Sequence, residues 1–180
     1  MPDDLKDLLD YSTVLVICRA EGMVNNNAKI VKELLEKHEH GVYITVNQPY
    51  AMLTKILQNH GIDTSRLFFV DCITKAASGK AERTENCLYL PSPESLTELS
   101  LSTMEVLQAL KGQKKFVFID SLGTFLLYNS AGSLSKFSHF LITKISLIGV
   151  DGIFMCIEEE MDEKLKAELQ SFCEKTIELK

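Results

Sequence analysis

A lysine and an aspartate in this chain stand where a nucleotide-binding protein carries its phosphate and metal contacts. Lys29 follows a short apolar stretch, residues 14–18, and a polar loop, and it lies near the start of an amphipathic helical pattern. Asp120 ends the predicted strand at residues 114–120, where four apolar residues precede it, and a carboxylate at the end of a buried strand can hold a magnesium ion. These two residues are therefore the candidate cofactor-binding residues, and the candidate cofactors are ATP and magnesium.

The loop before Lys29 lacks the residues that hold a phosphate. In the pattern GxxxxGK[ST], the glycines let backbone amides close around the phosphates, and the hydroxyl binds magnesium. Counting back from Lys29 puts Met23 and Ala28 at the glycine positions. Ile30 takes the hydroxyl position, and Gly22 is one residue out of place. Because side chains obstruct the conformations that glycine permits, we expect a degraded or ordinary strand-to-helix turn here.

Other groups with reactive side chains favour structural roles. His38 and His40 stand where a predicted helix ends, and no third ligand accompanies them, so we expect a surface pair rather than a metal site. Glu158, Glu159 and Glu160 follow a predicted strand and are typical of a solvated turn. The five cysteines include no CxxC pair, and no serine lies in a GxSxG context. The sequence therefore predicts no catalytic residue and no metal ligand.

Composition limits the class of protein. The 180 residues are 46% hydrophobic and 24% charged, which is typical of a globular protein. With 19 basic and 25 acidic residues the net charge is −6, which disfavours nucleic acid as a partner. No apolar run reaches the roughly 20 residues of a membrane-spanning helix, and the acidic N-terminus is unlike a signal peptide. We expect no membrane insertion and a cytoplasmic location.

Apolar runs alternate with amphipathic helical patterns along the chain. The predicted strands span residues 14–18, 42–46, 67–73, 87–90, 114–120, 152–158 and 176–180. The predicted helices span residues 28–38, 48–59, 95–110, 133–149 and 161–175, and residues 74–86 are predicted to form a mobile loop. Strands separated by helices pair in parallel, and strands apolar on both faces lie between two helical layers. The sequence predicts a single α/β domain over residues 1–180, a three-layer α/β/α sandwich with a mostly parallel sheet.

Several stretches together resemble the RecA-superfamily ATPases, specifically the KaiC-like branch of archaea and bacteria. The strand VYITV, residues 42–46, is followed by a helix, the turn HGID and the strand end FFVD. The stretch VFIDSLGTFLLY, residues 117–128, is similar to that family's Walker B strand and its continuation, and LQSFCEKTIELK resembles its closing helix and strand. The resemblance covers nearly the whole chain and implies a RecA/P-loop NTPase-like fold.

The chain departs from that family where the family does its chemistry. The family's catalytic glutamate falls at the pair Asn47 and Gln48, and an amide cannot accept a proton as a carboxylate does. The Walker A glycines and hydroxyl are also missing, while Asp120 remains. The resemblance thus implies a pseudo-ATPase with a degenerate Walker A, in which Lys29 and Asp120 are vestigial.

Three hypotheses follow for function. The first is a non-catalytic RecA/KaiC-like domain of archaeal type that acts in protein interaction or signal transduction without a cofactor. The second is a divergent ATP-binding protein or ATPase that uses Lys29 and Asp120 with magnesium. The third is an unrelated small-molecule α/β enzyme with its site at the carboxyl ends of the strands.

The predicted helix at residues 133–149 also bears on partners. Its apolar side chains cover more than the single stripe needed to dock on a sheet. The helix either packs on two sides within the chain or contacts another protein, and the region after Walker B faces neighbouring subunits in the KaiC-like family. We expect a protein partner, at most a homodimer or a contact with a different chain, with Phe137 and Phe140 as the residues to test.

Overall fold

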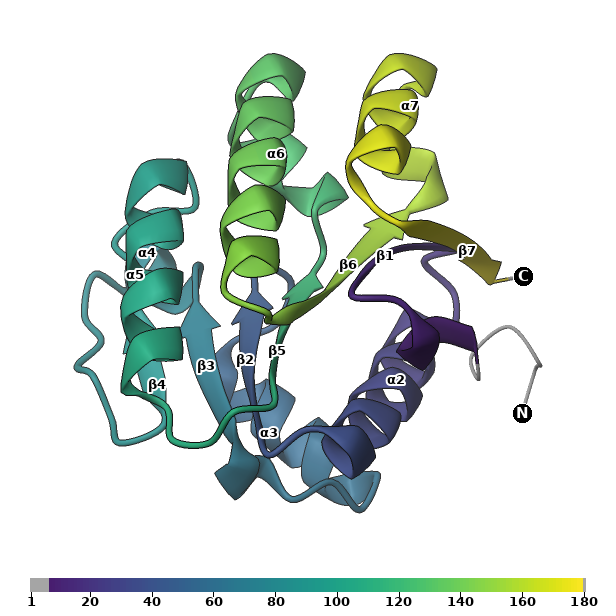
Figure 1. The fold of residues 1–180 in the computed structure, drawn as a ribbon. Coiled ribbons are helices and arrows are strands. Elements are labelled where there is room, and N and C mark those ends of the chain that lie inside the picture. The colour runs from purple at the N-terminus through teal and green to yellow at the C-terminus, as the bar shows by residue number, and fades with distance from the viewer. Residues whose placement is uncertain (1–6, 180) are drawn as a thin grey trace.

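A seven-stranded parallel sheet forms the centre of the computed structural model, which describes residues 7–179 (Figure 1). Its strands are β1 Thr13–Cys18, β2 His40–Thr45, β3 Leu67–Asp71, β4 Cys87–Tyr89, β5 Lys115–Asp120, β6 Asp151–Ile157 and β7 Lys175–Leu179. They lie in the order β4-β3-β2-β5-β6-β1-β7, and each neighbouring pair is parallel. The predicted parallel sheet is therefore confirmed.

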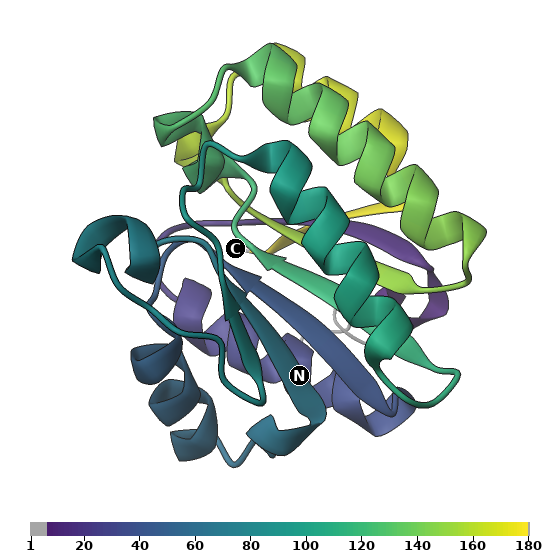
Figure 2. The same cartoon turned by 90° about the vertical axis from the view of Figure 1, so that its left-hand side faces the viewer.

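Helices cover both faces of the sheet. On one face lie α2 Met23–Lys37 and α3 Tyr50–Asn59, and on the other lie α5 Leu96–Ala109, α6 Ala131–Leu147 and α7 Glu163–Phe172 (Figures 1 and 2). The short elements are η1 Asp7–Asp10, η2 Thr64–Arg66, α4 Thr74–Ser78, η3 Gly123–Leu127 and η4 Glu158–Glu160. This is the three-layer α/β/α architecture that the sequence predicts.

The strands divide their side chains between two cores. In β1, Leu15 and Ile17 pack in the core beneath α5, α6 and α7, whereas Val14 and Val16 pack in the core beneath α2 and α3. All six residues of β1 are buried. A parallel sheet covered on both faces needs such continuous apolar strands, because neither face meets water. The alternation also decides which helical layer each residue at a strand end faces.

The connection after β1 is shorter than predicted. Gly22 adopts φ 90°, in the left-handed region that glycine enters without a steric penalty. The backbone N–H of Asn26 donates the first helical hydrogen bond to the Gly22 carbonyl oxygen, and α2 begins at Met23 rather than at residue 28. The start of the helix was missed because asparagines favour caps and turns. Burial of Met23 and Asn27 overrides that preference.

Two further expectations need correction. The predicted loop at residues 74–86 is wrong for its first part, because Thr74–Ser78 form α4 and Gly79 closes that helix in the left-handed region. Phe137 is not an exposed contact residue, since only 7% of it is accessible and it packs into the core under α6. Phe140, in contrast, is 51% exposed.

Candidate functional site

The carboxyl ends of three neighbouring strands bring polar side chains together on the α2–α3 face. Thr45 of β2 lies in register with Asp71 of β3 on one side and with Asp120 of β5 on the other. Asp71 has a structural task, because its carboxylate accepts hydrogen bonds from the backbone N–H groups of Tyr50 and Thr74. Asp120 is the second carboxylate in this register, and its neighbours decide what it can do.

Asp120 is held from two sides by uncharged donors. The Tyr43 hydroxyl donates to Oδ2 at 2.8 Å, and the Asn47 amide donates to Oδ1 at 2.9 Å. The aspartate is 4% exposed. Both carboxylate oxygens are thus engaged within the protein, and Asn47 belongs to the pair, Asn47 and Gln48, at which the resemblance places the family's catalytic glutamate.

A third side chain, Asn27 of α2, completes this group. It is 4% exposed and lies against the Asp120 carboxylate, while its own Oδ1 has no hydrogen-bond partner. Burial raises the pKa of Asp120, and hydrogen bonds from Tyr43, Asn47 and Asn27 act against that rise. Burial and the charge of Asp120 also raise the pKa of Tyr43, so the phenol remains a proton donor.

Glu160 approaches the same strand end from η4. Its carboxylate accepts long hydrogen bonds of 3.4 Å from Ser121 and Thr124, and these two hydroxyls lie 2.9 Å apart. A side chain at Gly123 would collide with the Glu160 carboxylate, so glycine permits this approach. Burial raises the pKa of Glu160, and the nearby Asp120 charge adds to that effect. The solvated turn predicted here is correct for Glu158 and Glu159, which are exposed, and wrong for Glu160.

Lys29 does not join this group. It is the seventh residue of α2, about 9 Å along the axis from the first at 1.5 Å per residue, and it lies on the exposed side of the helix. Only residues 19–22 separate β1 from α2. A phosphate cradle needs a longer glycine-rich loop with its lysine at the start of the helix, so the residues present do not match one.

A shallow hollow of about 560 Å³ adjoins Asn47 at the carboxyl edge. Its lining is mostly apolar and carries no charged side chain: Val46, Asn47, Ile73, Ala76, Ala77, Pro93, Thr124, Leu127 and Tyr128. A small-molecule enzyme uses several polar groups that converge on its substrate. Here Asn47 and Thr124 are the only lining side chains with strong hydrogen-bonding groups besides the Tyr128 phenol.

His38 is buried, contrary to the predicted surface pair. Its Nδ1 lies 2.8 Å from the Leu34 carbonyl oxygen, and its Nε2 lies 2.8 Å from Asp151 Oδ2. The ring thus joins the end of α2 to the start of β6. Within residues 7–179, no three His, Cys, Asp or Glu side chains gather in a way that could hold a metal ion.

Comparison with protein families gives a match along nearly the whole chain. Residues 12–179 match a family described as "Family of unknown function (DUF7504)". The chain belongs to this family. Comparison of the DUF7504 chain with curated protein sequences found no match.

Solved structures share the fold of this DUF7504 chain at low sequence identity. The uncharacterized protein PH0321 from Pyrococcus horikoshii, in complex with an unknown peptide, is 12% identical with a TM-score of 0.69, covering 94% of this chain and 78% of PH0321. PH0250 from Pyrococcus horikoshii OT3 is 13% identical with a TM-score of 0.65, covering 98% of this chain and 87% of PH0250. The flagellar accessory protein FlaH from Methanocaldococcus jannaschii is 11% identical with a TM-score of 0.64, covering 93% of this chain and 70% of FlaH. These similarities confirm the RecA-like α/β fold.

Sequence reasoning found Asp120 and Asn47 and missed the residues that hold them. Asn27 shares the inner face of α2 with Val31 and Leu34, at a spacing of four and three residues. That spacing places Asn27 on the inner face of a helix that begins at residue 23. For Tyr43, the pattern of VYITV indicated burial but not its hydrogen-bond partner.

One further expectation concerns membranes. Across residues 7–179, no helix combines the length and apolar character that spanning a bilayer requires.

Proposed function

We propose that this DUF7504 chain is a non-catalytic RecA/KaiC-like domain that acts in the cytoplasm through contacts with other protein chains. The observation that carries the proposal is the Asp120 group. In a working nucleotide site this carboxylate must be available to a hydrated magnesium ion. Here Tyr43 and Asn47 occupy its two oxygens, and the residue is almost fully buried.

The neighbouring elements support the same proposal. The Arg19–Gly22 connection is too short to wrap around phosphates, and Lys29 points away from the strand ends on the outer side of α2. Asn47 cannot serve as a general base in place of a glutamate. The proposed role therefore requires no phosphate loop, no phosphate-binding lysine and no catalytic glutamate.

Contacts with other chains are supported by a structural neighbour and by the surface. PH0321 is described in complex with an unknown peptide, which fits a protein-binding role for this shape of domain. On the present chain, exposed apolar side chains occur as adjacent pairs, Leu127 with Tyr128 and Leu147 with Ile148. Adjoining exposed apolar groups are the kind of surface that a protein partner covers.

Calorimetric titration with ATP, ADP and GTP, with and without magnesium, tests the absence of nucleotide chemistry. Without a cradle and with Asp120 already bound, we expect no dissociation constant below about 1 mM, equivalent to about −4 kcal/mol. Asp120→Asn and Lys29→Ala are the matched variants. Micromolar binding of Mg-ATP that either variant abolishes would favour the divergent ATPase and overturn the proposal.

A further inference from the structure

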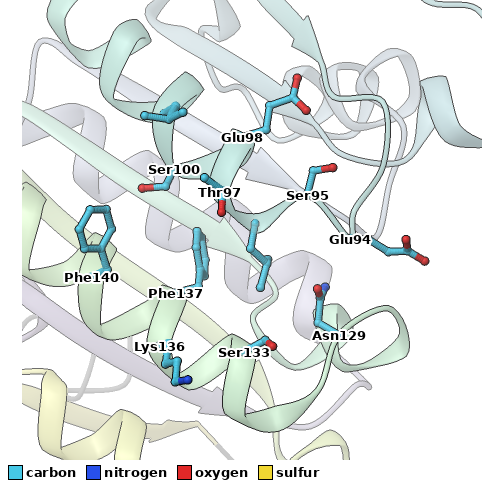
Figure 3. Close-up of a pocket in the computed structure, with 12 residues that line it drawn as sticks. Glu94, Ser95, Thr97, Glu98, Ser100, Asn129, Ser133, Lys136, Phe137 and Phe140 are labelled. Carbon is cyan, nitrogen blue, oxygen red and sulfur yellow. The ribbon is translucent and has the colours of Figure 1, made fainter.

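The surface between α5 and α6 contains an open groove of about 960 Å³ (Figure 3). Phe137 and Phe140 project from α6 toward Thr97 and Ser100 of α5 in this view. Leu101 on α5 also lines the groove. Leu101 is 59% exposed and Phe140 is 51% exposed, so both side chains would lose unfavourable contact with water if another surface covered them.

Half of the exposed large apolar side chains lie on α5, on α6 or at the end of α6. Among the described residues, eight large hydrophobic side chains are exposed, and four of them belong to α5, α6 or the residue that ends α6. These four are Leu101, Phe140, Leu147 and Ile148. Two of these four, Leu101 and Phe140, line the groove from opposite helices, and adjoining exposed apolar side chains are what protein partners cover.

Charge is divided between the two helices. The charged side chains of α5 are Glu98 and Glu105, both acidic, and those of α6 are Lys136 and Lys144, both basic. All four fall outside the ion pairs found among the described residues. Glu98 and Lys136 extend from opposite rims of the groove in Figure 3.

The order of charged and apolar residues is the same on both helices. Leu101 stands between Glu98 and Glu105, which are seven residues or about 10.5 Å apart along the helix. Phe140 stands between two lysines that are eight residues or about 12 Å apart. An acidic–apolar–acidic row on α5 therefore matches a basic–apolar–basic row on α6 in spacing and is opposite to it in charge.

We infer that the occupant of this groove is a second copy of the chain, related by a two-fold axis that runs along the groove. Such an axis keeps each residue at its own height and places α5 of one protomer on α6 of its partner. Glu98 then meets the lysine at 136 of the second copy, and Leu101 meets its phenylalanine at 140. Glu105 meets the lysine at 144 in the same way.

The charges select this arrangement over the alternative. A two-fold axis across the helices would lay α5 on α5 and α6 on α6, and like charges would face one another at four positions. Like charges placed opposite each other suppress an arrangement, while complementary charges fix its register. A two-fold interface also repeats each favourable pair, so every contact contributes twice.

This inference deepens the proposed interaction role and rests on it. The two are tested independently. If the chain bound nucleotide, the proposed function would be wrong although a dimer could still form. If the chain were monomeric, the dimer would be wrong although the chain could still bind no nucleotide. Sedimentation equilibrium over a concentration series is the measurement. The parent chain is expected to be a dimer that dissociates on dilution.

Charge reversal identifies the surface. Glu98→Lys and Lys136→Glu are each expected to weaken the dimer about tenfold, and the double variant E98K/K136E to regain most of the loss, because coupled residues depart from additivity. Lys32→Glu, an exposed lysine on α2 on the opposite face, is the matched control and should leave the dimer unchanged. Unfolding midpoints close to that of the parent confirm that the variants are folded.

Three results would overturn the inference. The first is a parent chain that stays monomeric at every concentration. A monomeric chain whose groove binds a foreign peptide would count as the same result. The second is a dimer that the single reversals leave unchanged. The third is a double variant that remains as weak as the single ones, which would mean that the two residues do not meet.

Discussion

Asp120 is a carboxylate kept where water scarcely reaches it. Its three neighbours, Tyr43, Asn47 and Asn27, are neutral, so they donate hydrogen bonds without supplying a compensating positive charge. Burial dominates and raises the pKa of Asp120 above the ordinary value of 3.8. A folded group that holds its proton more tightly than the unfolded chain does makes stability depend on pH.

The variant Asp120→Asn isolates this dependence. Between pH 3.8 and the raised pKa of folded Asp120, the folded parent binds more protons than the unfolded parent, so the parent loses stability as pH rises. The variant does not titrate at this position. We therefore expect its free energy of unfolding, relative to the parent, to increase as pH rises through this range, as measured by urea unfolding at a series of pH values.

Asp63 provides a control of opposite sign. Hydrogen bonds from Ser65 lower the pKa of Asp63, so this aspartate stabilises the fold above pH 3.8 and less at lower pH. Asp63→Asn should therefore lose stability relative to the parent as pH rises. If Asp120→Asn behaved in the same way as Asp63→Asn, the Asp120 charge would be favourable in the folded state, and a metal or nucleotide role would regain support.

At the scale of elements, Asp71 joins three parts of the fold. From the end of β3 its carboxylate accepts hydrogen bonds from the Tyr50 N–H at the start of α3 at 2.8 Å. It also accepts from the Ile73 and Thr74 N–H groups at 2.9 and 2.8 Å, and from the Thr74 hydroxyl at the start of α4. One buried side chain thus satisfies the unpaired amides of two helix starts.

Asp71→Asn should show how much these elements depend on that carboxylate. The amide can still accept from Ile73 and Thr74 through one oxygen, but its NH₂ group would face the Tyr50 N–H, and two donors repel. We expect the free energy of unfolding to fall by about 2 kcal/mol. Hydrogen exchange should accelerate at the first amides of α3.

Asp162 offers the matched control for this experiment. It caps α7 by accepting from the Leu165 N–H at 2.7 Å through Oδ1. Because asparagine is also a good N-cap residue, Asp162→Asn should change stability by only a few tenths of a kcal/mol. An Asp71→Asn chain as stable as the Asp162→Asn chain would contradict the role assigned to Asp71.

The elements were largely predictable from sequence, whereas the candidate site was not. Burial repeats with the period of a strand or helix, so local patterns gave the strands and the two helical layers. The contact between Tyr43 and Asp120 joins residues 77 positions apart, and no local pattern contains it. Glu160 was misread for the same reason, because three glutamates in a row indicate solvent until the fold places Gly123 beneath one of them.

At the scale of the whole molecule, α6 serves two environments. Its inner side, including Leu134, Phe137 and Leu141, fills the core against the sheet. Its outer side presents Phe140 and Leu147 to solvent. The excess of apolar residues that the sequence shows in this helix therefore has two physical causes, and mutation can separate them.

Two variants of α6, Phe137→Ser and Phe140→Ser, distinguish the contribution of its buried side from that of its exposed side. The two residues are three positions apart on the helix. Removing the buried Phe137 ring leaves a cavity and a buried hydroxyl, and we expect a loss of about 3–5 kcal/mol in the free energy of unfolding. Removing the exposed Phe140 ring should change the stability of the protomer by no more than about 0.5 kcal/mol. It should weaken self-association, since this ring meets Leu101 of the second copy in the proposed dimer. Urea unfolding measured beside sedimentation equilibrium distinguishes the two effects. A Phe140→Ser chain that associates as strongly as the parent would show that the outer side of α6 remains in solvent and that the copies, if they pair, do so elsewhere.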